Sequence, residues 1–376
     1  MGGFSTLGGG TSWEQIKQKL ETEGAKNKSY DSDVDGVIDK LPLLSFVNFK
    51  VYSEYSTSSG DNPRNLYATG NYLYWCLHRA TRLVIFDISE RYNPKKVSDL
   101  SLDYNPLNID GKGDYIYVGG SNGLHIYDIS NPTNPTEVGT LSLGTYIHGF
   151  YFDKVNDIIY ACCHIADKLS VIDVSDPTAP TEIGSLTDST NLNGIHDCVL
   201  DPDNNLLYVT NYRPDSSGVA LAVIDVSNPT SLSILYTYLN GRKRSYITKY
   251  GNYLLVGSHI NDSKLIIVDA TDPSSISVVR EFLDYGNAGY WVAIKDNRAI
   301  VTLIDHVYYG AGKADGLAII NMDNLSIEQI IPAPFTDNLH IYARHLLIYD
   351  NYLYASTQLY DGSNYIPRLD VWKLRW

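Results

Sequence analysis

The chain has little charge for its length. Only 19% of its 376 residues are Asp, Glu, Lys or Arg, and the formal net charge is -14. The one dense basic run is Arg242-Lys243-Arg244, which predicts a solvated loop. A nucleic-acid-binding surface needs clustered Lys and Arg side chains to contact phosphates. We therefore expect no nucleic-acid partner.

Cysteine is also scarce. The four cysteines are Cys76, Cys162, Cys163 and Cys198, and none forms a Cys-x-x-Cys pair. The spacing gives no support to a zinc site or to a thioredoxin-like redox site. We expect small buried side chains, with a bridge between Cys198 and one of the adjacent pair as the alternative.

Long apolar runs are missing as well. No segment approaches the roughly 18 apolar residues that a membrane-spanning helix needs. Residues 1–10 contain neither the basic segment nor the apolar segment of a secretory signal. We therefore expect no membrane span and no signal peptide.

A short phrase recurs along the chain. Val171-Ile172-Asp173-Val174-Ser175-Asp176-Pro177 is typical of a strand that a turn ends, because Pro cannot donate to a sheet and Asp caps turns. Similar phrases occupy 85–89, 126–132, 223–229 and 267–273. Similarity at a long, regular spacing indicates a repeat architecture.

Each repeat contains four short predicted strands, which in the first repeat lie near 65–69, 72–76, 83–87 and 97–100. The last repeat has only three strands, and a spare strand at 46–52 precedes the first repeat. Pairing the spare strand with the last repeat removes an exposed sheet edge. The sequence therefore predicts an all-β, seven-bladed β-propeller at 45–376, preceded by a separate segment at 1–44.

The recurring phrase, with its Tyr-rich strand and Gly-Asn turn, resembles the LVIVD repeat family of β-propellers. The resemblance covers about 60–376, and it weakens in the last two repeats, where Asn321 and Lys373 replace the Asp. Members of that family are mostly cell-wall-associated or extracellular, and the resemblance implies no single activity.

The Asp of the phrase recurs in phase in five repeats, as Asp87, Asp128, Asp173, Asp225 and Asp269. A catalytic role would require one special carboxylate instead of five equivalent ones. We expect these side chains to accept hydrogen bonds from backbone N–H groups in the turns that follow.

Three repeats are longer than the others, and the extra residues fall in the connection between the second and third strands, at 211–218, 305–316 and 358–368. Insertions on one face of a repeat protein usually mark its binding face. Tolerated insertion without a ligand is the alternative. The candidate ligand-binding residues there, for a glycan or a protein, are Tyr212, Arg213, Tyr308, Tyr309, Tyr360 and Tyr365.

The first strand of each repeat begins on the same face, beside the central channel. Counting back from the turn that ends this strand gives Asn65, Asn108, His148, His196, Tyr246, Trp291 and His345. We treat Trp291 and the three histidines as candidate ligand-binding residues, for a metal or another ligand. The alternative is that each histidine bonds the backbone of a neighbouring blade.

The segment before the propeller carries closely spaced acids. Residues 11–24 predict a helix, and a calcium-binding loop of the EF-hand type would use Asp31, Asp33, Asp35, Val37 and Asp39. Pro42 stands where such a loop has a bidentate Glu, and the helix ends too early. Calcium is thus a candidate cofactor on carboxylate chemistry alone.

The same segment, from Trp13 to Gly36, is similar to part of bacteriophage tail-fibre proteins. That resemblance implies a non-enzymatic binding propeller displayed on a virion or an extracellular surface. Residues 1–44 would contact other subunits or form a homo-oligomer. The alternatives are an enzyme with a site around His148, His196 and Trp291, or a secreted scaffold that calcium stabilises.

Overall fold

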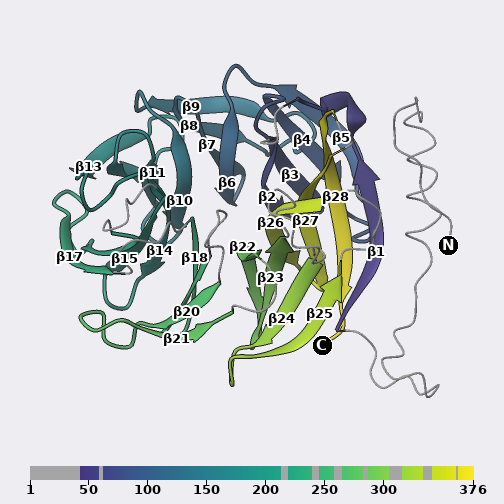
Figure 1. Cartoon of the computed structure of the whole chain (residues 1–376). Helices are drawn as coiled ribbons and strands as arrows, with labels where there is room; N and C mark the ends of the chain where they lie inside the picture. The colour runs from purple at the N-terminus through teal and green to yellow at the C-terminus, as the bar shows by residue number, and fades with distance from the viewer. Residues whose placement is uncertain are drawn as a thin grey trace, which may run out of the picture.

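The structure is a computed structural model that describes residues 43–58, 62–212, 219–238, 245–257, 265–282, 287–304, 316–332, 341–360 and 363–376. In this part of the chain the strands form seven four-stranded sheets, arranged as blades around a central axis (Figure 1). The prediction of an all-β, seven-bladed propeller is therefore confirmed. The predicted helix at 11–24 and the acidic loop lie outside the described residues.

The blades share one strand order, from the central axis outwards. The innermost strands are β2 (Pro63–Thr69), β6 (Pro106–Lys112), β10 (Ile147–Asp153), β14 (Ile195–Asp201), β18 (Tyr246–Tyr250), β22 (Asn287–Lys295) and β26 (Ile341–Tyr349). The second strands are β3 (Tyr72–Leu77), β7 (Tyr115–Gly120), β11 (Ile158–Cys163), β15 (Leu206–Asn211), β19 (Tyr253–Gly257), β23 (Arg298–Ile304) and β27 (Tyr352–Tyr360).

The third strands, which carry the recurring phrase in most blades, are β4 (Arg82–Asp87), β8 (Gly123–Asp128), β12 (Lys168–Asp173), β16 (Leu221–Asp225), β20 (Ile266–Asp269), β24 (Gly316–Asn321) and β28 (Tyr365–Leu374). The outer strands are β5 (Lys95–Ser101), β9 (Thr136–Ser142), β13 (Thr181–Thr187), β17 (Ser233–Tyr238), β21 (Ser277–Glu281), β25 (Ser326–Pro332) and β1 (Leu44–Val51). A single 3₁₀ turn, η1 (Ser53–Tyr55), follows β1. Within the described residues, no helix has the length and apolarity to span a membrane.

The middle strands are buried on both faces, which explains their nearly continuous apolar sequences. In β3, Trp75 packs with blade 7 on one side, and Tyr74 packs with blade 2 on the other. Side chains alternate between the faces of a strand, and in a propeller both faces meet another blade. Each of the seven hydrophobic clusters accordingly draws residues from two adjacent blades.

The ring is closed by β1, the first strand of the chain. It pairs antiparallel with β28, from Leu44 opposite Leu374 to Val51 opposite Arg368, and so completes blade 7 (Figure 1). The expected closing strand is thus confirmed, and it begins two residues earlier than the predicted 46–52.

The recurring carboxylates cap turns, as predicted. The Oδ1 atom of Asp128 accepts a hydrogen bond from the backbone N–H of Ser130 at 2.7 Å, and Asp225 accepts one from Ser227 at 2.9 Å. The same contact is made by Asp87, Asp173, Asp269 and, in blade 6, Asn321. Hydrogen bonds from the side chain and backbone of Ser130 lower the pKa of Asp128.

The turn after each phrase also fixes the spacing between blades. A Cβ atom added to Gly139, in outer strand β9, would lie 2.1 Å from the carbonyl oxygen of Pro177 in the next blade. Gly184, in β13, would meet the carbonyl oxygen of Pro229 at 2.2 Å in the same way. Glycine at these positions lets the outer strand approach the backbone of the neighbouring turn.

We predict that Gly139→Ala lowers the urea midpoint of unfolding, because the new methyl group must push two blades apart. Overpacking of this kind costs about 1–3 kcal/mol. Thr140→Ala, a change at the adjacent exposed residue, is the control and should alter stability by less than about 0.5 kcal/mol. Equal unfolding midpoints for the two variants would contradict this account of the spacing.

The last blade corrects one prediction. Residues 358–368 were expected to form a loop insertion. Residues 358–360 and 365–368 instead belong to the paired strands β27 and β28, and Thr57 pairs with Tyr365 beside them. Arg368 is fully buried, where its guanidinium lies 4.8 Å from the Phe49 ring centroid and pairs with Asp370. The pairing of the two strands extends as far as Tyr360 opposite Tyr365.

The buried Arg368–Asp370 pair generates a second stability prediction. Asp370→Asn removes the carboxylate that pairs with the buried Arg368, and breaking a buried pair in this way costs about 3–5 kcal/mol. Glu90→Gln, which removes the partner of Lys95 in an exposed pair, should cost under about 1 kcal/mol. Urea unfolding of both variants measures the difference, and comparable losses would rule out a structural role for the buried pair.

Candidate functional site at the mouth of the central channel

The first residues of the innermost strands are irregular. All of these strands except β18 have a shift of register near the start, typical of a β-bulge. In β10 the residue skipped by the pairing is His148, and in β14 it is His196. A bulge re-aims a side chain that regular pairing would place on a sheet face. Here it turns both imidazoles toward the channel.

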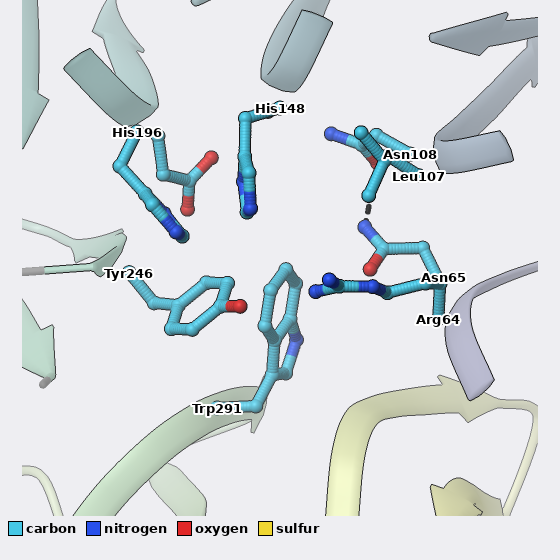
Figure 2. Close-up of a pocket in the computed structure, with 10 residues that line it drawn as sticks. Arg64, Asn65, Leu107, Asn108, His148, His196, Tyr246 and Trp291 are labelled. Carbon is cyan, nitrogen blue, oxygen red and sulfur yellow. Dashed lines mark hydrogen bonds between the residues drawn. The ribbon is translucent and has the colours of Figure 1, made fainter. Parts of the chain in front are cut away.

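These side chains line a small pocket on the face where the innermost strands begin (Figure 2). Its cavity volume is about 10 Å³, which is space for about one water molecule. The lining residues come from blades 1 to 6, namely Arg64, Asn65, Leu107, Asn108, His148, Gly149, His196, Asp197, Tyr246 and Trp291. We call these residues the channel mouth.

A row of rings crosses the channel mouth. The ring centroids of His148 and His196 are 3.7 Å apart, and Tyr246 lies 5.1 Å from His196. Trp291 follows at 4.6 Å from Tyr246, and His345 at 4.4 Å from Trp291. The row therefore connects five blades, 3 to 7, through aromatic contacts.

Two residues that follow second strands extend the row. His164, directly after β11, lies 5.4 Å from His148, and Tyr212, directly after β15, lies 5.5 Å from His196. The connections between second and third strands thus share a face with the starts of the innermost strands. Tyr212, His164, His148 and Trp291 are half-buried, so the row is accessible from this face.

Hydrogen bonds fix the state of two histidines. The Nδ1 atom of His196 donates to the carbonyl oxygen of Ser245 in blade 5 at 2.6 Å. The Nδ1 atom of His345 accepts from the backbone N–H of Leu66 in blade 1 at 3.3 Å. Burial lowers the pKa of His345 to about 3. These are the bonds expected of histidines that join two blades.

Asp197 is the acid of the channel mouth. Its Oδ2 atom accepts from the backbone N–H of Ile247 at 3.2 Å, and Gly149 packs so closely that a Cβ there would lie 2.8 Å from Oδ1. Burial raises the pKa of Asp197 to about 7, against the effect of hydrogen bonds from the N–H groups of Ile247 and Cys198. The carboxyl group is therefore partly protonated at neutral pH.

The structure brings some predicted residues together and separates others. Trp291, His148 and His196 meet at the channel mouth, His345 lies directly behind Trp291, and Tyr212 borders His196. Tyr365 belongs to the β27–β28 hairpin and is not among the lining residues. Outside the described residues are Arg213, Tyr308 and Tyr309, the side chain of Tyr360, and the candidate calcium ligands at 31–39.

The sequence reasoning missed Arg64, His164 and Asp197. Arg64 and Asp197 are direct neighbours of counted positions, and the bulges that place them in the pocket have no clear sequence signal. Among the described side chains, no group of three or more His, Cys, Asp or Glu is arranged to hold a metal ion. All four cysteines are buried and free, as the leading expectation had it.

The blades, the closing strand and the channel mouth define a seven-bladed β-propeller. A family profile described as LVIVD repeat matches four segments of the chain, 108–142, 160–188, 217–240 and 241–284. The chain is therefore a seven-bladed β-propeller in which four segments match the LVIVD repeat. A comparison with curated protein sequences found no match.

Solved structures share the fold at low sequence identity. The hydrazine synthase of Kuenenia stuttgartiensis is 12% identical with a TM-score of 0.58, covering 80% of this chain and 95% of that one. The WD40 β-propeller domain of Doa1 is 10% identical with a TM-score of 0.59, covering 88% and 98%. The periplasmic gluconolactonase PpgL of Pseudomonas aeruginosa is 13% identical with a TM-score of 0.57, covering 72% and 84%. At this identity the likeness concerns the fold alone.

The raised pKa of Asp197 predicts a specific pH dependence. Its pKa rises from 3.8 to about 7 on folding, so the folded chain binds more protons between these values. The contribution of this group to stability is complete below pH 3.8 and is lost as pH rises through 7, by about 1.4 kcal/mol per pH unit.

Urea unfolding of the wild type and Asp197→Asn from pH 4 to pH 8 measures this effect. We expect the free energies of unfolding to converge or cross as pH rises, because only the wild type loses the proton-linked contribution. Any loss of stability that does not depend on pH shifts the whole Asp197→Asn curve and leaves its slope against pH unchanged. Asp203→Asn, at a neighbouring exposed residue, should run parallel to the wild type, and a parallel curve for Asp197→Asn would contradict the assignment.

Proposed function

We propose that the protein is a non-enzymatic binding propeller that engages a glycan through the channel mouth and the loops around it. The observation that carries the proposal is the accessible row of rings from Tyr212 to Trp291, bordered by the amides of Asn65 and Asn108. Aromatic faces pack against the apolar face of a sugar, and amides exchange hydrogen bonds with its hydroxyl groups.

Core packing accounts for part of this composition, because Trp291 packs against the hydrophobic cluster between blades 6 and 7. The innermost strands already contact one another around the ring, and in blades 1 and 2 a single Asn65–Asn108 hydrogen bond of 2.6 Å joins the equivalent positions. Blades 3 to 6 instead carry large rings, three of them at shifts of register. Convergent polar and aromatic groups in a concave site are the usual form of a ligand site.

Display on a virion or a cell surface belongs to the same proposal. It rests on the resemblance of residues 13–36 to tail-fibre proteins and on the segment 1–44, through which the chain would contact other subunits. Calcium at residues 31–39 likewise rests on the sequence. A binding propeller needs only that the channel mouth faces outwards.

The proposal predicts that Trp291→Ala weakens glycan binding at least tenfold, because large aromatic side chains contribute most to such sites. The measurement is binding of fluorescently labelled full-length protein to an array of chemically diverse glycans, followed by titration of the strongest glycan. Tyr92→Ala is the matched control, since Tyr92 is 48% exposed in the β4–β5 turn on the opposite face.

The proposal is supported if the wild type and Tyr92→Ala both bind a glycan and Trp291→Ala does not. If the array shows no bound glycan, or if both variants bind as well as the wild type, the channel mouth is not a glycan site. Melting curves of the variants verify that each remains folded.

A further inference from the structure

The β7–β8 turn combines an Asn-Gly dipeptide with a buried histidine. Asn122 is exposed in this turn, and Gly123 begins β8. His125 is only 7% exposed, and its Nε2 atom lies 2.8 Å from Oδ1 of Asn122. In an Asn-Gly dipeptide the backbone nitrogen of the glycine reaches the Asn side chain easily, because no Cβ atom hinders its approach. A reactive dipeptide therefore lies against a polar ring.

A carboxylate holds the other side of this ring. The Nδ1 atom of His125 lies 2.6 Å from Oε1 of Glu137, in the outer strand β9. Each ring nitrogen thus faces an oxygen, and the protonated ring satisfies both contacts because it donates from both nitrogens. In that form the Nε2–H group donates to the side-chain carbonyl of Asn122.

Packing fixes the direction of the imidazole. The ring of Tyr104, in the β5–β6 connection, stacks on it with a centroid distance of 3.6 Å and an angle of 9°. The hydroxyl of Tyr104 lies 3.0 Å from that of Tyr127. A donor that neighbouring side chains hold in place loses little of its effect to motion.

Deamidation begins when the backbone nitrogen of Gly123 attacks Cγ of Asn122. The N–Cγ bond forms, the nitrogen loses its proton to water, and negative charge develops on Oδ1. A donor already placed at that oxygen stabilises the charge. The imidazolium then protonates the departing amide nitrogen, so the C–N bond breaks and ammonia leaves, and the ring regains its proton from water. Water opens the resulting succinimide to aspartate or isoaspartate.

We propose that Asn122 is a self-deamidating site, with His125 as the catalytic residue and Glu137 as the residue that positions it. The product places a carboxylate beside His125, and isoaspartate also adds one carbon atom to the backbone of the turn. The turn connects a second strand to a third strand, so it lies on the face of the channel mouth. The modification would therefore change this face with time. It does not depend on glycan binding.

A second Asn-Gly dipeptide provides an internal comparison. In Asn193-Gly194 the backbone N–H of Gly194 donates to Oδ1 of Asp167 at 2.7 Å. The attacking nitrogen is therefore held in a hydrogen bond that the reaction must break. We expect Asn193 to react more slowly than Asn122. The third such dipeptide, Asn240-Gly241, lies outside the described residues.

The experiment incubates the full-length protein at pH 7.4 and 37 °C and follows each site by peptide mapping with mass spectrometry. We expect Asn122 to react several times faster than Asn193, with isoaspartate among the products. His125→Phe keeps a ring that can stack on Tyr104 but removes both nitrogens, and it should slow the reaction of Asn122 by about tenfold. Glu137→Gln should slow it as well, and Glu137→Asp should recover part of the rate.

Glu182→Gln is the matched control, because Glu182 occupies the equivalent position of β13 in the next blade and pairs with Lys168. It should leave the rate at Asn122 unchanged. In concentrated urea the wild type and all variants should react at Asn122 at equal rates, because the ring contacts are lost. Melting curves verify that each variant is folded, and if His125→Phe does not fold, the two Glu137 variants decide the question.

The outcomes are distinct. Equal rates at Asn122 for the folded wild type, His125→Phe and Glu137→Gln would overturn catalysis by His125. A faster reaction in the two variants would mean that the ring protects the amide, and would overturn the proposal as well. A rate at Asn122 no higher than that at Asn193 would overturn the site itself. None of these results bears on the glycan proposal.

Discussion

Closure of the ring is the constraint on which the rest of the structure depends. A blade buries both faces only if it has two neighbours, and blade 7 acquires its outer strand when β1 pairs with β28. Without this pairing β28 would be an exposed edge. Closure also has a local consequence, because it places blade 7 between Trp291 of blade 6 and Arg64 of blade 1. The channel mouth is therefore assembled from residues far apart in the sequence.

Much of the fold could be predicted from the recurring phrase. Its regular spacing predicts the number of blades, and the strand missing from the last repeat predicts that an N-terminal strand closes the ring. Its Asp predicts the turn hydrogen bonds that Asp128 and Asp225 accept. The same count placed His148, His196 and Trp291 at one level, and they do line one pocket. Positions that repeat in phase are predictable because each blade packs against its two neighbours in the same way.

The rest depends on local departures from the repeat. Bulges in β2 and β14 bring Arg64 and Asp197 into the pocket, and a shift of one residue reverses which face a side chain occupies. Nothing in an alternating sequence marks where such a shift occurs. In blade 7 the sequence instead predicted too little regular structure. The turn residues near 361–364 suggested a loop, but the strands on either side of them are paired, and Thr57 pairs with Tyr365.

Equivalent positions in the ring have unequal chemistry, and this inequality is the strongest physical reason to assign a ligand to the channel mouth. His345 and His196 occupy the same count from their turns. His345 is neutral and buried behind Trp291, where it accepts from Leu66, whereas His196 donates from Nδ1 and turns the other edge of its ring toward the channel. A scaffold role explains the first histidine completely. The ring of the second also lines the pocket that Arg64, Tyr246 and Trp291 share.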